Sequence, residues 1–325
     1  MFDPVVLFQL GPLTVTAYGV CLAVAIAVSL LALRPRAKRM GMPEGTVLRF
    51  GLTAIPLAVV GARLFYCAVR APRLFPEYDA GFLLRIWEGG FGIAGAFGGC
   101  ALAAYITARR TGQPVGRMMD CVVPGCALML ALARFSEGFA GTGYGDYLEN
   151  EALWFFPLAV KNIYGEYYVA LFMLEGLVAL ALAAALLRME KRGTADRPGD
   201  LTLLFLLLYG ATQIVLESLR RDSFLRWGFV RVNQLFGVAL LALVTAVFSA
   251  QAWRAGASRT RLALEWSAAL LCVGVGVGME FAFEKSRIPN LIAYGILIAA
   301  MAVIAGLAFA QMRRARRLEG SAAPR

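Results

Sequence analysis

Residues 201–221, LTLLFLLLYGATQIVLESLRR, begin as an apolar helix of membrane-spanning length and end in charged residues. Polar residues recur through the stretch at steps of three or four positions: Tyr209, Gln213, Glu217 and Arg220. Such steps place side chains on one face of a helix. An ionisable side chain inside a membrane is costly, and it usually marks a lined cavity, a proton relay or a substrate site. The stretch therefore predicts a membrane protein that handles something polar.

The rest of the chain has the same membrane character. Of 325 residues, 60% are hydrophobic, and the mean hydropathy is +0.68. A helix needs about 20 mainly apolar residues to cross a bilayer. The composition predicts an all-α polytopic membrane bundle of about nine transmembrane helices. They are expected near residues 13–33, 49–69, 91–108, 118–133, 167–187, 201–219, 232–253, 262–283 and 291–312.

The basic residues predict the orientation of this bundle. The chain has 32 Lys and Arg residues and a net charge of +11. Of these, 20 lie in or beside the connections that follow the odd-numbered spans, against 11 on the other side. Because positive charge accumulates on the cytoplasmic side, the N-terminus is expected outside and the C-terminus in the cytoplasm. Charge distributed in this way indicates topology and anionic lipid, and it does not predict nucleic acid as a partner.

The chain contains no histidine. This excludes histidine-based acid–base catalysis, nucleophiles activated by histidine, and histidine-ligated metal. Its six cysteines include no CxxC pair, so a zinc site is not supported either. The charged groups left for catalysis are Asp, Glu, Lys and Arg, with Tyr and Cys as further candidates.

Two connections on the predicted outer side are long. Residues 70–90 lead into a glycine run at 89–99, which would let another backbone or a lipid chain approach closely. Residues 134–166 are too many for a tight turn. Loops of that length are usually functional or independently folded.

Three elements are expected to converge on the outer half of the membrane: Arg63, Arg134 and the polar face Tyr209–Arg221. The planar fork of arginine donates two parallel hydrogen bonds to a phosphate, so arginines beside apolar walls suit a phospholipid. Glu217 has two readings. It is either an ion-pair partner of a buried arginine or a general base or orienting carboxylate.

Five stretches, in this order, resemble the prolipoprotein diacylglyceryl transferases, a family of bacterial inner-membrane enzymes. They are FDPVVLFQLGPLTVTAYGV (2–20), GARLFY (61–66), LLRIWEGGFGIAGAFGG (83–99), RFSEGFAGTGYG (134–145), and YGATQIVLESLRRD (209–222) followed by NQL (233–235). The resemblance implies transfer of diacylglycerol from phosphatidylglycerol to the lipobox cysteine of a prolipoprotein signal peptide, with formation of a thioether. It implies no metal and no soluble cofactor, and the bacterial plasma membrane as the location.

The resemblance also implies roles for individual residues. The predicted catalytic residues are Tyr18, Glu137 and Glu217, the phosphate-binding residues are Arg63, Arg134 and Arg220, and the loop glycines are Gly141 and Gly145. Three positions depart from the family pattern. Ala94 stands in place of a histidine, Glu137 in place of an asparagine, and Gln213 in place of an arginine.

These departures keep two other hypotheses open. One is a catalytically degenerate relative that binds lipid or a membrane partner, and the other is a small polytopic transporter. A degenerate site should show its charged groups paired with each other, whereas an enzyme should gather them around a lipid headgroup. The predicted division is a transferase-like core of seven helices at 1–255, followed by two additional helices and a basic tail at 256–325.

Overall fold

The computed structural model describes residues 3–11, 13–74, 80–221, 225–227, 230–285 and 290–322. Phe2, Pro12 and Asp222 of the quoted motifs, and residues 75–79 of the first long connection, lie outside this set. The chain forms two compact units. One comprises Met1–Thr202 and Leu219–Asn233, and the other comprises Leu203–Ser218 and Gln234–Arg325.

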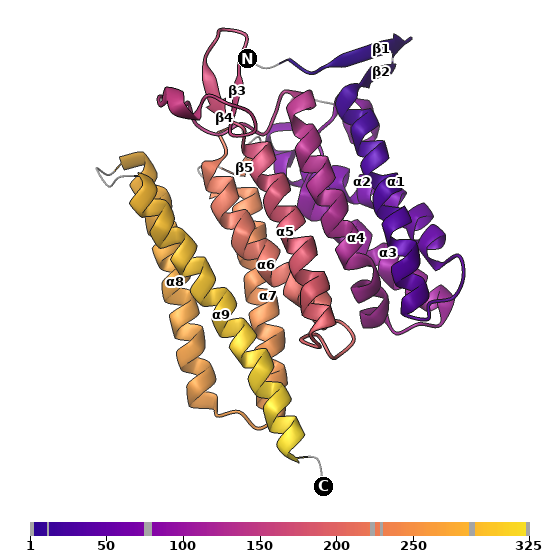
Figure 1. Ribbon diagram of the computed structural model, residues 1–325, viewed down its shortest axis with the longest axis vertical. Helices are drawn as coiled ribbons and strands as arrows, with labels where there is room; N and C mark the ends of the chain where they lie inside the picture. Colours follow the sequence, from indigo (N-terminus) through magenta and orange to yellow (C-terminus); the bar gives the residue numbers. More distant parts are fainter. Residues whose placement is uncertain are drawn as a thin grey trace. The chain divides into compact units, whose positions relative to one another are not determined.

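The first unit contains five long helices with short hairpins and 3-10 turns between them (Figure 1). The helices are α1 (Ala17–Arg39), α2 (Thr46–Leu74), α3 (Ile93–Thr111), α4 (Val115–Ser136) and α5 (Leu171–Lys191). The 3-10 turns are η1 (Ala80–Leu84), η2 (Ile86–Glu88), η3 (Glu137–Ala140) and η4 (Glu151–Leu153). The antiparallel hairpins pair β1 (Val6–Leu10) with β2 (Leu13–Thr16), β3 (Ala159–Lys161) with β4 (Tyr167–Val169), and β5 (Arg226–Trp227) with β6 (Val230–Arg231).

The helices confirm the predicted all-α polytopic bundle. With α6 (Asp200–Leu219), α7 (Val232–Arg254), α8 (Arg259–Lys285) and α9 (Asn290–Ala322), the described residues hold nine α-helices. Eight are long and apolar enough to cross a membrane. The exception is α3, in which glycines and the terminal Arg109 and Arg110 lower the mean hydropathy. The predicted fourth span, the shortest, is a full helix of 22 residues.

The first helix begins later than the predicted span at 13–33. Residues Leu13–Thr16 form strand β2, and α1 starts at Ala17. Thr16 is the N-cap, because its backbone is extended and its side-chain oxygen accepts a hydrogen bond from the Gly19 amide at 3.1 Å. This is the usual way in which a threonine starts a helix.

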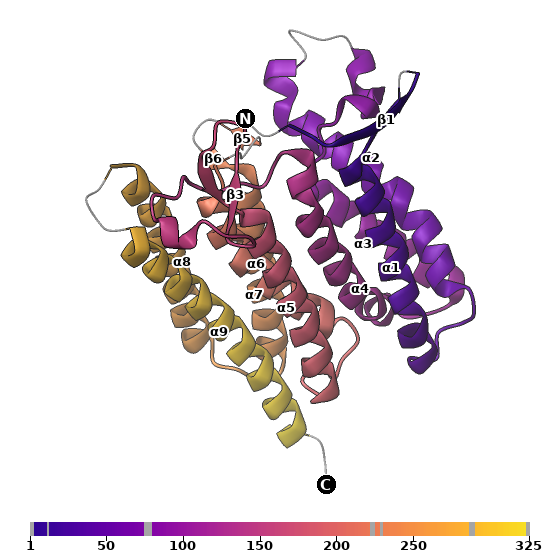
Figure 2. The same cartoon turned by 45° about the horizontal axis from the view of Figure 1, so that its top comes forward.

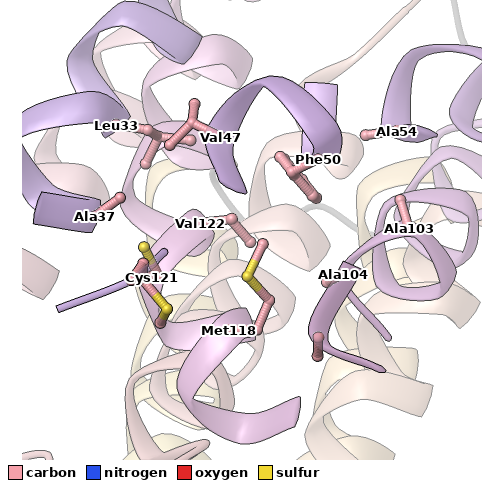
Figure 3. Close-up of a cluster of buried hydrophobic side chains, with 12 residues drawn as sticks. Leu33, Ala37, Val47, Phe50, Ala54, Ala103, Ala104, Met118, Cys121 and Val122 are labelled. Carbon is pink, nitrogen blue, oxygen red and sulfur yellow. The ribbon is translucent and has the colours of Figure 1, made fainter. Parts of the chain in front are cut away.

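The core of the first unit lies between α1, α2, α3 and α4 (Figure 3). Its larger side chains are Leu33, Phe50 and Met118, and small residues such as Ala103 and Ala104 fill the space between them. Small residues let membrane helices approach closely, and close approach replaces the hydrophobic drive that is weak within lipid.

Glycines bring α2 and α3 into direct backbone contact. A Cβ atom at Gly95 would collide with the Gly61 carbonyl, and one at Gly99 would collide with the Leu57 carbonyl. The predicted close approach of a second backbone to the glycine run is therefore confirmed at these two positions, and the approaching element is α2.

Arg36, near the end of α1, holds three helices of the first unit together. Its guanidinium donates to the Asp120 carbonyl at 2.9 Å and to the Cys121 carbonyl at 3.0 Å, both on α4. It also binds the Glu190 carboxylate on α5, with Nη2 at 2.7 Å from Oε1. These donors satisfy polar groups that would be costly to leave unpaired in a membrane protein.

The Asp120 side chain fixes the start of α6. Its carboxylate accepts hydrogen bonds from the Gly199 amide at 2.6 Å, the Thr202 amide at 2.8 Å and the Thr202 hydroxyl at 2.7 Å. The amides at a helix start have no partner inside the helix, and a carboxylate there also opposes the positive end of the helix dipole. Asp120 thus caps α6 from a neighbouring helix.

The second unit contains most of α6 together with α7, α8 and α9, of which α8 and α9 run side by side (Figure 2). A polar network joins α7, α8 and α9. Trp266 donates to Ser249 at 3.0 Å, and Ser249 donates to the buried Gln311 at 2.8 Å. Glu265 accepts from Gln311 at 3.0 Å and from Arg314 at 2.7 Å. Polar contacts of this kind stabilise helix association in lipid.

Candidate functional site

Two arginines and two glutamates form a buried cluster in the first unit, called here the four-residue cluster. Arg134 lies in the last turn of α4, Glu137 begins η3, Glu175 lies near the start of α5, and Arg220 directly follows α6. The cluster therefore joins elements that are distant in sequence but meet at one end of α4 and α5.

Each arginine in the cluster contacts both carboxylates. Arg134 Nη1 lies 2.5 Å from Glu137 Oε1 and 3.1 Å from Glu175 Oε2. Arg220 Nη2 lies 2.5 Å from Glu137 Oε2, and its Nη1 lies 3.4 Å from Glu175 Oε2. The two positive charges are thus balanced by two negative charges. Such balance is needed where ions are removed from water.

Sequence reasoning missed Glu175. It is the single charged residue in the apolar start of α5, LFMLEGLVALALAAALL. Its side chain is 2% exposed. A lone carboxylate inside an apolar membrane helix is itself a signal for a functional or paired group. The same rule that pointed to Glu217 would have found Glu175.

The glycines of the loop after α4 have geometric reasons to be glycine. Gly141 ends η3 with a φ of +70°, a conformation that side chains rarely adopt. Gly145 donates to the Val169 carbonyl at 2.9 Å, and a Cβ there would lie 3.2 Å from the Leu219 carbonyl. Gly143, which sequence reasoning did not single out, has a φ of +84°, and a Cβ there would lie 2.9 Å from Glu137 Oε2.

Tyr18 lies beside the cluster. It is the second residue of α1 and is half-buried. Arg134, Glu137 and Arg220 all act electrostatically on its hydroxyl. The N-terminal segment is also attached to η3, because the Val5 amide donates to the Phe139 carbonyl at 2.9 Å. The structure therefore brings four of the predicted site residues together in one unit.

Arg63 has partners of its own in the first unit. Its guanidinium donates to the carbonyl oxygens of Phe82 at 2.6 Å, Arg85 at 3.0 Å and Gly90 at 3.3 Å, and also to that of Gly89. The Cζ atom of Arg63 lies 4.4 Å from the centroid of the Phe82 ring. Among the described residues, no recorded ion pair or hydrogen bond links Arg63 to the four-residue cluster. The structure places Arg63 as a clamp on residues 82–90.

Glu217 belongs to the second unit. It is 1% exposed, and the side chain of Gln213 donates to its Oε2 at 3.3 Å. The predicted polar face of α6 is thus confirmed for this pair, one turn apart. Farther along, Gln234 of the NQL motif donates to Glu280 at 2.6 Å, within the same unit.

The long loop after the cluster is folded. Trp154 stacks on Tyr167, with ring centroids 4.5 Å apart, and donates to the Leu148 carbonyl at 2.8 Å. Tyr168 donates from its hydroxyl to Glu166 at 3.1 Å, and this hydrogen bond raises the pKa of Tyr168. The loop is therefore an ordered, folded segment that follows the cluster in sequence, as its length predicts.

Comparison with known proteins gives one consistent result. The family model for prolipoprotein diacylglyceryl transferase matches residues 5–250. A phosphatidylglycerol–prolipoprotein diacylglyceryl transferase of Streptococcus pneumoniae serotype 4 (strain TIGR4) is 31% identical over 246 residues, which cover 75% of this chain and 92% of that relative. The proteins of the same name from strains Hungary19A-6 and G54 are each 30% identical over 246 residues, with the same shares covered.

The chain belongs to the prolipoprotein diacylglyceryl transferase family. It is therefore a multi-pass membrane transferase of lipoprotein maturation. The matched region ends at residue 250, near the end of α7, so α8 and α9 lie beyond it. Arg134, Glu137 and Arg220 lie inside the matched region, as does Glu175.

Proposed function

We propose that this chain moves the diacylglyceryl group of phosphatidylglycerol to the lipobox cysteine of prolipoprotein signal peptides. One observation carries the proposal. Arg134 and Arg220, from different elements, direct their guanidinium groups at the same pair of carboxylate groups, so the two cations lie close together. Two adjacent arginine forks form a site for the phosphate of a lipid headgroup. The names of the relatives supply the two substrates.

The chemistry requires little beyond holding and positioning. The cysteine thiol gives its proton to a carboxylate, for which Glu137 is the candidate, and the thiolate attacks the glycerol carbon that carries the phosphate. The carbon–sulfur bond forms as the carbon–oxygen bond breaks, and the electron pair leaves with glycerol phosphate. Arg134 and Arg220 stabilise the charge that develops on this leaving group. A thiol with a pKa near 8.5 needs only a modest shift, which nearby cations favour.

The other site residues have proposed roles of different kinds. Glu175 is a positioning residue, because its Oε2 lies between both guanidinium groups. Tyr18 or Glu137 assists near the thiol, Glu217 keeps its proposed role as an orienting carboxylate, and Gly141 and Gly145 shape the loop that follows α4. Arg63 remains a candidate for the set of phosphate-binding arginines, although its Nη1 and Nη2 atoms donate to backbone carbonyls.

The cellular setting follows from the same proposal. The chain is placed in the bacterial plasma membrane, with its N-terminus outside and its C-terminus in the cytoplasm, and it has no nucleic acid partner. The transferase core is assigned to residues 1–255, and the two further helices with the basic tail to 256–325. The direct test of topology is labelling of single cysteines placed at either terminus.

The test of the activity uses the purified full chain in bilayers of phosphatidylglycerol with a lipobox peptide. We expect a diacylglyceryl mass increment on the peptide cysteine and none on a serine version of the peptide. Arg134→Ala should abolish the increment. Arg110→Ala, which removes an exposed arginine at the end of α3, is the matched control and should keep it.

A second candidate, a lipid-binding relative without transferase activity, is favoured by one observation. Both arginines already pair with carboxylates, Glu137 and Glu175. A folded chain that binds phosphatidylglycerol vesicles but never produces the mass increment would support this candidate and overturn the enzyme assignment. The transporter hypothesis has no comparable support, since the family is one of transferases.

A further inference from the structure

We propose that Glu137 occupies the place of the substrate phosphate in the resting protein, so that phosphatidylglycerol binds by displacing this carboxylate from Arg134 and Arg220. The inference rests on the proposed function, because it concerns the same headgroup site. It makes Glu137 a built-in competitor that sets how tightly the lipid binds.

The geometry of Glu137 is that of a bridging anion. Its Oε1 lies 2.5 Å from Arg134, and its Oε2 lies 2.5 Å from Arg220. The two free oxygens of a phosphodiester can bridge two guanidinium groups in the same way. Glu175 is different, because the same oxygen, Oε2, faces both arginines at 3.1 and 3.4 Å. In Glu137 each carboxylate oxygen binds its own arginine, and this is the phosphate-like arrangement.

Charge balance favours the departure of a carboxylate when a phosphate enters the cluster. Arg134 and Arg220 are already matched by Glu137 and Glu175. A phosphodiester adds one negative charge, and three negative groups beside two positive groups would be strongly unfavourable out of water. Substrate binding is thus a replacement of one anion by another.

Glu137 is better placed to leave than Glu175. The side chain of Glu137 is 15% exposed, against 2% for Glu175. Glu137 also lies at the first position of a four-residue 3-10 turn, whereas Glu175 lies within the 21-residue helix α5. A short turn that ends at Gly141 can change conformation at less cost than a packed helix.

The experiment measures anion binding without turnover. The purified full chain in detergent is titrated with glycerol phosphate by calorimetry, and the dissociation constant is compared among variants. We expect Glu137→Gln and Glu137→Asn to bind at least about tenfold more tightly than the wild type, because two charge-assisted hydrogen bonds no longer have to break first. The KM for phosphatidylglycerol should fall in parallel.

Glu175→Gln is the matched control. It removes the same single negative charge from the cluster but leaves Glu137 bridging the two arginines. We expect it to tighten binding by less than about threefold, because the bridging carboxylate remains in place. Equal tightening in Glu175→Gln and Glu137→Gln would show that net charge alone matters and would overturn the inference.

The outcomes separate this inference from the proposed function. Unchanged or weaker glycerol phosphate binding in both Glu137 variants, each checked for folding by thermal unfolding, would overturn the inference even if the wild type transfers diacylglycerol. Tighter binding in a protein that never transfers diacylglycerol would support the inference and remove the proposed activity. The Gln and Asn side chains differ in length, so the test still works if one of the two Glu137 variants fails to fold.

Discussion

Opposite ends of the first unit both bury arginine beside carboxylate, but they use it differently. At one end, Arg36 donates to two backbone carbonyls of α4 as well as to Glu190. At the other end, the ion pairs of Arg134 and Arg220 run from side chain to side chain. Asp120 and Arg134 mark the two ends on α4, and 14 residues of helix separate them by about 21 Å.

The difference separates a structural contact from an exchangeable one. A carbonyl oxygen is fixed by the helix that carries it, so an arginine bound to it ties two helices together permanently. A carboxylate on a side chain can rotate away and be replaced by another anion, as the Glu137 bridge illustrates. The partner of a buried arginine therefore indicates its role better than burial or charge does.

Arg134→Lys should give the largest effect at the four-residue cluster. Lysine keeps the charge but loses the planar fork that holds two oxygens at once. We expect kcat/KM for diacylglyceryl transfer to fall by about 100- to 1,000-fold, the usual cost of removing one oriented donor from a developing anion. The measurement is the rate of thioether formation on a lipobox peptide.

The thermal unfolding temperature of Arg134→Lys should stay close to that of the wild type. A large loss of stability with little loss of rate would instead place Arg134 in the structural class and would break the comparison of the two ends.

Arg36→Gln tests the other end. The change leaves the Glu190 carboxylate and the carbonyls of Asp120 and Cys121 without their charged donor. We expect a loss of about 2–4 kcal/mol in unfolding free energy, because one hydrogen bond to a charged group contributes about 1.5–3 kcal/mol net and glutamine keeps part of the contacts. The transfer rate per folded molecule should stay within about twofold of the wild-type rate. A larger fall in this rate would show that Arg36 belongs to the substrate site.

The helices could be predicted from sequence because lipid restricts a spanning chain to simple choices. Every backbone group in a membrane must be satisfied, so a long apolar run becomes a helix. Two predicted spans, 13–33 and 167–187, start four residues early, because a hairpin strand precedes α1 and α5 and an apolar run alone does not separate a strand from a helix start. The β-hairpins were missed because their strands, of two to five residues, are too short to show an alternating pattern.

The candidate site was predicted only in part. Arg134, Glu137 and Arg220 follow from motif positions, and the structure brings them together with Tyr18. Sequence could not show that Glu137 bridges both arginines, because that depends on how η3 leaves α4. Sequence reasoning also gave Arg63 and Arg134 the same role, because the sequence does not show whether carbonyls or carboxylates surround an arginine.

Asp120→Asn should have a smaller effect than Arg36→Gln. Asparagine keeps the size of the side chain and one acceptor oxygen, but its amide group would face either the Gly199 amide or the Thr202 donors. The charge opposite the start of α6 is also lost. We expect a loss of about 1–2 kcal/mol in unfolding free energy, as for removal of a helix cap. Denaturant titration in detergent measures it, and an unchanged midpoint would show that Asp120 does not cap α6.

Arg63→Lys should have the smallest effect, and it decides between two accounts of Arg63. Lysine keeps the positive charge but has three donors in place of five, so it cannot serve all the carbonyls of residues 82–90 that Arg63 serves. If Arg63 only binds the carbonyls, Arg63→Lys should lower the unfolding free energy by about 1 kcal/mol. As a phosphate ligand, it should instead show a raised KM for phosphatidylglycerol with an unchanged unfolding temperature. The first result extends the rule that carbonyl-bound arginines are structural, and the second breaks that rule at Arg63.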